Sequence, residues 1–158
     1  MYKMYVIPRP YSMYIMLSSN QFLTSSYYAY IHDEYIISSL IFSIYITSLL
    51  LWYNPIDGIR KRVDSTLVTS TAVYFLYLSK FNVIVYTGTF IMLFTHCVSY
   101  RLFYKKRFDL SAYCHLFIHC LGNMINIYLI YHIHSLKTMS LLETPQWTDI
   151  CLSDSVSK

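Results

Sequence analysis

The chain has 158 residues, of which 56% are hydrophobic and only 13% are charged. Soluble domains carry roughly 25% charged residues, so this composition favours a single membrane-embedded domain over a cytosolic one. The formal net charge is +4, and the basic residues lie at the ends of apolar runs rather than along one stripe, which argues against nucleic-acid binding.

Residues 1–34 form a Tyr-rich and Ser-rich arm that contains two early prolines, Pro8 and Pro10. Its apolar run over 11–17 is too short to span a bilayer, which requires about 20 residues. We expect this arm to be interfacial or irregular, and an additional, poorly marked membrane segment is the alternative. No clean apolar core leads to a small-residue cleavage site, so no signal peptide is predicted.

Four long apolar segments follow, and each is a continuous run without the alternation that marks a membrane β-strand. Their lengths are close to what a helix needs to cross a bilayer. The sequence therefore predicts an all-α fold, an integral membrane helical bundle of about four transmembrane helices. The predicted helices are 35–53, 63–79, 83–100 and 110–134, and a polar C-terminal tail follows over 135–158.

Two short connections carry most of the cations. The first contains Arg60, Lys61 and Arg62, and the second, over 101–107, is also rich in Lys and Arg. Four crossings place both connections on the same side of the membrane, and the positive-inside rule assigns that side to the cytoplasm. Both termini are then predicted on the non-cytoplasmic side.

The cysteines give no sign of a zinc ribbon or of a disulfide framework. Cys97, Cys114, Cys120 and Cys151 include no CxxC pair. Three of them fall inside apolar segments, where a thiol usually serves as a small packing residue.

The last apolar segment contains the strongest functional signal. His115 and His119 are four residues apart, so both imidazoles point to the same side of a helix. Ionisable side chains inside a membrane are costly and are often functional. Three further polar residues fall at a similar depth, near the predicted cytoplasmic ends of their helices: Ser48, Asp64 and His96.

These five residues predict a metal site if their helices turn the same faces inward. His96, His115 and His119 would be the metal ligands, because imidazole nitrogens and carboxylate oxygens bind zinc in tetrahedral sites. Asp64 would be a ligand or the base that orients a zinc-bound water, and Ser48 would be a hydrogen-bond partner. On this hypothesis zinc is the cofactor, and Asp64 and Ser48 are the catalytic residues.

Each of these residues also has a structural interpretation. A buried His often donates to a nearby carbonyl or hydroxyl, an Asp near a helix start often caps that helix, and a Ser often bonds back to its own helix. Trp52 and Tyr53 would be interfacial anchors, and His132 and His134 would be wet residues at the other membrane surface. The sequence leaves these alternatives open.

The order of the motifs resembles the CREST superfamily of membrane hydrolases, which includes alkaline ceramidases and the progestin/adiponectin-receptor group. That pattern has a Ser and a His four residues apart near the end of one helix, an Asp at the start of the next, and His-x-x-x-His in the last. Over roughly residues 48–122, Ser48, Asp64, His115 and His119 match this pattern, with Gly122 close behind, and Trp52 occupies the place of the first His. The resemblance implies zinc and hydrolysis of a lipid amide or ester at the membrane surface.

Two features depart from that family pattern. Trp52 stands where the first His would be, which removes one zinc ligand, and His96 could supply the missing nitrogen. The chain also has about four predicted spans where the family has seven. A shortened relative, a degenerate non-enzyme and a coincidental match therefore all stay open.

Two functional hypotheses follow for a multi-pass membrane protein in contact with the lipid bilayer. The first is a zinc-dependent lipid amide or ester hydrolase, with its site near the cytoplasmic face and a lipid as substrate. The second is a non-catalytic membrane protein, such as a virus- or organelle-encoded accessory factor, that acts through helix–helix association.

Overall fold

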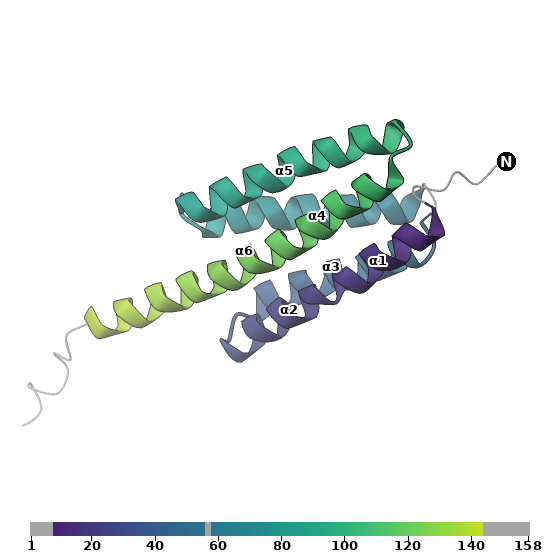
Figure 1. Ribbon diagram of the computed structural model, residues 1–158. Helices are drawn as coiled ribbons and strands as arrows, with labels where there is room; N and C mark the ends of the chain where they lie inside the picture. The colour runs from purple at the N-terminus through teal and green to yellow at the C-terminus, as the bar shows by residue number, and fades with distance from the viewer. Residues whose placement is uncertain (1–7, 56–57, 144–158) are drawn as a thin grey trace, which may run out of the picture.

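The computed structural model describes residues 8–55 and 58–143, and every element in these ranges is an α-helix (Figure 1). The predicted all-α class is thus confirmed for the described part of the chain. The helices are α1 (Arg9–Ser19), α2 (Gln21–Ile31), α3 (Tyr35–Tyr53), α4 (Ile59–Leu78), α5 (Val83–Tyr104) and α6 (Phe108–Glu143). The tail predicted from residue 135 begins inside α6, and residues 144–158 lie outside the described ranges.

From Arg9 onward the N-terminal arm is helical rather than irregular. Asn20 keeps right-handed helical backbone angles between α1 and α2, so the two helices continue as one bent rod beside α3 (Figure 1). Buried side chains of this rod recur every three or four residues, at Ser12, Ile15, Ser19, Phe22, Ser26 and Ala29, and Ser25 beside Ser26 is buried as well. Small side chains let helix backbones approach closely, but they lower the hydropathy by which a membrane segment is recognised.

The other helices bury stripes with the same spacing. In α3 the stripe consists of Ile37, Ile41, Ile44, Ser48 and Leu51. Alternating steps of three and four residues keep one face of a helix against its neighbours at the shallow crossing angle of helical bundles. The main core joins α2, α3, α4, α5 and α6, and its most buried members include Ile41, Leu129 and Ile130.

The long helix α6 is central to the bundle. It packs against α5 along one side and against α1 and α2 along another, whereas α3 packs against α1, α2 and α4 (Figure 1). The α5–α6 contact is especially close at Gly88, where an added Cβ would lie 2.9 Å from Ile125 Cγ1. By contrast, α4 and α5 touch only slightly apart from their connection.

Reciprocal serine pairs join two of the helical hairpins. Ser26 and Ser38 connect α2 to α3, and each donates its hydroxyl to the other's backbone carbonyl, at 3.0 and 2.8 Å. Ser99 and Ser111 connect α5 to α6 in the same way, at 3.0 and 3.1 Å. In both pairs the serines are 12 residues apart, so each pair closes one antiparallel hairpin.

Three of the described helices are long and apolar enough to cross a membrane: Tyr35–Tyr53, Val83–Tyr104 and Phe108–Ser140. They correspond to three of the four predicted spans. The segment predicted as 63–79 forms α4, but its first turns carry Arg60, Arg62 and Asp64, and Ser and Thr residues follow. Because of these polar residues, α4 is not among the helices that are apolar enough to cross a membrane.

Candidate functional site

His119 lies on the buried stripe of α6, the half-buried His115 lies one turn before it, and their ring centroids are 6.0 Å apart. His119 is only 6% exposed. Its ring lies 5.2 Å from the ring of Phe22 on α2, and the ring of His115 lies 5.0 Å from that of Trp52 on α3. Aromatic side chains from two other helices therefore shield this pair from solvent.

The tautomer of His119 follows from its hydrogen bond to Ser18, which links α6 to α1. His119 Nδ1 and Ser18 Oγ are 2.7 Å apart. Ser18 donates its single hydroxyl hydrogen to the carbonyl of Ile15, also at 2.7 Å. Both contacts of Ser18 are satisfied together only when Nδ1 of His119 carries the hydrogen, and in that tautomer Nε2 has a free lone pair.

The same argument applies to His115. Its Nδ1 lies 3.4 Å from Ser99 Oγ, and the Ser99 hydroxyl donates to the carbonyl of Ser111 at 3.0 Å. Nδ1 of His115 is then the donor, and its Nε2 also carries a lone pair. An Nδ1–H held by an oxygen, with Nε2 available, is the arrangement found in many metal-binding histidines.

His96 lies at the edge of this pair. Its ring centroid is 5.9 Å from that of His115, but the residue is exposed. The buried positions of α5 include Val85, Gly88 and Ser99, and His96 lies one residue off the stripe that they define. Within residues 8–55 and 58–143, no group of three or more His, Cys, Asp or Glu side chains is arranged to hold a metal ion.

Asp64 belongs to a separate polar contact between α3 and α4. Its Oδ1 accepts hydrogen bonds from Thr47 at 2.8 Å and from Ser48 at 3.0 Å. Gly58 precedes α4, and Asp64 is the sixth residue of the helix, so the capping interpretation is wrong. Ser48 bonds across to α4 rather than back to its own helix.

Residues of α3 connect these two groups. Ser48 and Trp52 are one helical turn apart and both are buried; Ser48 contacts Asp64, whereas Trp52 contacts His115. Trp52 is 5% exposed, so it is a packing residue and not an anchor exposed at the surface of the bundle. In the described part of the chain, Asp64 makes no hydrogen bond to an imidazole.

Sequence reasoning did not identify Ser18, Phe22, Ser99 or Ser111 as parts of this site. A usable signal existed in the spacing of small residues along α1, α5 and α6, which marks the faces that approach closely. No motif marked the individual positions, because serines are common in this chain.

No protein-family model, curated protein or solved structure matches this chain. The resemblance to the CREST superfamily therefore stays a prediction that depends on the motif residues alone. The candidate site consists of the two imidazoles, their hydroxyl partners and the apolar helices that surround them.

Proposed function

We propose that this chain is a multi-pass integral membrane protein whose buried imidazole pair binds zinc. Support for membrane insertion comes from the three long apolar helices and from the large apolar side chains that they turn outward. On α5, Phe90, Leu93 and Phe94 are each at least 61% exposed, and a bilayer would cover them favourably.

The observation that supports metal binding most strongly is the pair of Nε2 lone pairs on neighbouring turns of α6. Ser18 and Ser99 hold the opposite ring nitrogens of His119 and His115. Zinc prefers neutral imidazole, and His96 is the nearest further nitrogen ligand. The ion would supply a Lewis acid and a bound water with a pKa of about 7.

Hydrolysis of a lipid amide or ester is the reaction class that the CREST resemblance implies for such a site. In this proposal His96, His115 and His119 hold the metal, while Asp64 and Ser48 form the adjacent catalytic contact. Trp52 takes the place of the family's first His and packs its ring against His115. The site lies at the end of the bundle that carries the two basic connections, which we call the basic end.

The metal content of the purified full-length chain tests this proposal. We expect about one zinc per chain after purification from zinc-replete cells. The double variant His115→Ala/His119→Ala should lose it, whereas His132→Ala/His134→Ala, on the same helix but outside the pair, should retain it. A metal-free wild-type protein, or equal zinc in both double variants, would contradict the proposal.

A second candidate is a non-catalytic membrane protein that acts through helix association. The two reciprocal serine pairs favour it, because they show how hydroxyl groups join helices of this chain at close range. Co-purification of a stoichiometric partner with metal-free protein would support this candidate. Unchanged association after replacement of the outward-facing Ser and Thr residues would contradict it.

The helical rod of α1 and α2 changes the orientation that we propose for the start of α1 and the end of α6. The rod of α1 and α2 runs the length of the bundle, and residues 8 and 143 lie at opposite ends of it (Figure 1). If the rod also crosses the membrane, the start of α1 lies on the same side as the basic connections, which the positive-inside rule places in the cytoplasm. The end of α6 then lies on the other side.

A further inference from the structure

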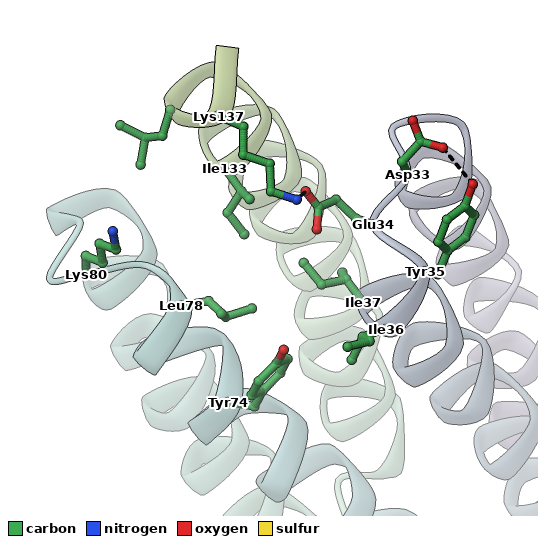
Figure 2. Close-up of a pocket in the computed structure, with 11 residues that line it drawn as sticks. Asp33, Glu34, Tyr35, Ile36, Ile37, Tyr74, Leu78, Lys80, Ile133 and Lys137 are labelled. Atoms are coloured by element: carbon green, nitrogen blue, oxygen red, sulfur yellow. Dashed lines mark hydrogen bonds and ion pairs between the residues drawn. The ribbon is translucent and has the colours of Figure 1, made fainter. Parts of the chain in front are cut away.

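A pocket of about 490 Å³ lies at the end of the bundle opposite the basic end. Figure 2 shows it between the last turns of α4 on one side and α6 with the start of α3 on the other. Ile37, Leu78 and Ile133 contribute apolar surface from these three helices. The interior is therefore suited to a hydrocarbon chain.

Two hydrogen-bond donors of this pocket have no acceptor among the residues that the structure describes. The first is the ammonium group of Lys80, in the turn between α4 and α5 at the rim. The second is the hydroxyl of Tyr74, which points into the space beside Leu78 and Ile36 (Figure 2). Unpaired donors at the rim and on the wall are suited to a ligand with oxygen acceptors.

The other charged groups of the rim have partners within the chain, although the Asp33 carboxylate, which accepts from a neutral tyrosine, keeps its negative charge. Lys137 forms an ion pair with Glu34, and Tyr35 donates its hydroxyl to Asp33 at 2.6 Å (Figure 2). Lys80 is thus the cation of this pocket that remains for a bound anion. Its ammonium group and the apolar walls together favour a ligand that is both anionic and hydrophobic.

The backbone of the turn fixes the position of Lys80. Lys80 and Phe81 have φ angles of 46° and 66°, in the left-handed region that residues with a side chain rarely adopt. Asn82 then caps α5 by accepting hydrogen bonds from the amides of Ile84 and Val85. The capped helix and the end of α4 hold this turn at the pocket rim.

A further unsatisfied group lies on the same face of α4. Thr71 precedes Tyr74 by three residues and lies about one turn deeper in the bundle. It is 2% exposed, and its Oγ1 has no hydrogen-bond partner in the described part of the chain. Thr71 does not line the pocket, so the partner that its hydroxyl needs is a buried water rather than the pocket's ligand.

We propose that this pocket binds an amphipathic anion with an acyl chain. The chain lies between Ile37, Leu78 and Ile133, the anionic head contacts Lys80, and an oxygen of the ligand accepts from Tyr74. The head is the carboxylate of a free fatty acid or the phosphate of a phospholipid. This site is at the other end of the bundle from His115 and His119, so it does not depend on metal binding.

Equilibrium binding to the purified full-length chain in a non-ionic detergent tests the proposal. The probes are oleate, phosphatidic acid with two oleoyl chains, and the neutral dioleoylglycerol. We expect at least one anionic probe to bind on the order of tenfold more tightly than the neutral one, because a charge-assisted contact is lost in the latter. The preferred anionic probe identifies the head as carboxylate or phosphate.

Lys106 provides a matched control for Lys80. It is also an exposed lysine in a helix–helix turn, with a φ of 57°, but it lies at the basic end. Lys80→Ala should weaken anion binding about tenfold and Lys80→Arg should retain most of it, whereas Lys106→Ala should leave it unchanged. Tyr74→Phe should weaken binding about threefold, since it removes one neutral hydrogen bond.

Three results would overturn the proposal. The first is equal affinity for the neutral and the anionic probes. The second is equal effects of Lys80→Ala and Lys106→Ala, which would indicate non-specific attraction to a basic protein. The third is unchanged binding in Leu78→Trp, whose larger side chain would fill the pocket. Zinc content should be unaffected by all of these variants.

Discussion

His119 Nδ1 on α6 lies 2.7 Å from Ser18 Oγ on α1, a contact between residues 101 positions apart in the chain. Ser18 Oγ also lies 2.7 Å from the carbonyl oxygen of Ile15, so both contacts are satisfied together when the imidazole donates to Ser18. This hydrogen bond ties the N-terminal rod to the central helix and favours the tautomer with the hydrogen on Nδ1. This links the stability of the bundle to the chemistry of its candidate site.

Replacement of Ser18 tests that link. Ser18→Ala should reduce the free energy of unfolding by about 1 kcal/mol, because the buried Nδ1–H of His119 loses its acceptor. It should also shift the ¹⁵N resonances of the His119 ring, which distinguish the two tautomers. Ser70→Ala is the control, since Ser70 is exposed and bonds only within α4. Equal effects of the two substitutions would show that the Ser18 contact does not hold the ring.

The close approach of α5 and α6 gives a second prediction. Gly88→Ala would bring a methyl group against Ile125 and should destabilise the bundle by about 1–3 kcal/mol through overpacking. Ile125→Val removes the nearest methyl group and should relieve much of this cost in the double variant. Denaturation of the two single variants and the double variant measures the coupling. Additive effects would mean that these residues are not in contact.

The two serine pairs allow a matched comparison at the candidate site. Ser99→Ala and Ser38→Ala each remove one member of a reciprocal pair, so both should lower stability by a similar amount. Only Ser99 also contacts an imidazole, that of His115. Ser99→Ala should therefore weaken zinc affinity about tenfold, and Ser38→Ala should not. Calorimetric titration with zinc measures this difference, and equal affinities would remove Ser99 from the site.

Much of the fold could be predicted from long apolar runs. The spans expected at 35–53, 83–100 and 110–134 correspond to α3, α5 and α6, because continuous hydrophobicity of that length has few other stable forms. The rod of α1 and α2 was missed because its buried face is made largely of serine. Hydropathy treats serine as polar, whereas in a helix interface its small size permits close packing.

Less of the site could be predicted. Spacing on one helix placed His115 and His119 on one face, as the structure has them. The depth of the polar residues predicted Ser48 as a hydrogen-bond partner in the site, and the structure pairs it with Asp64. The contacts between helices depend on rotation about each helix axis. His96 illustrates this dependence: a shift of one position from the buried stripe of α5 leaves it exposed at the edge of the pair.

A bundle that spans the membrane must expose its outward apolar faces to lipid. Spin labels measure this lipid exposure in reconstituted bilayers. Each label is attached to a single cysteine that replaces Phe94 on α5, or Lys80 or Lys105 in the turns, and the native cysteines are replaced by serine. We predict that the Phe94 label collides mainly with oxygen, which concentrates in the hydrocarbon core. Labels at Lys80 and Lys105 should collide mainly with a water-soluble nickel chelate. Equal access of the chelate to all three positions would contradict a bundle that spans the membrane.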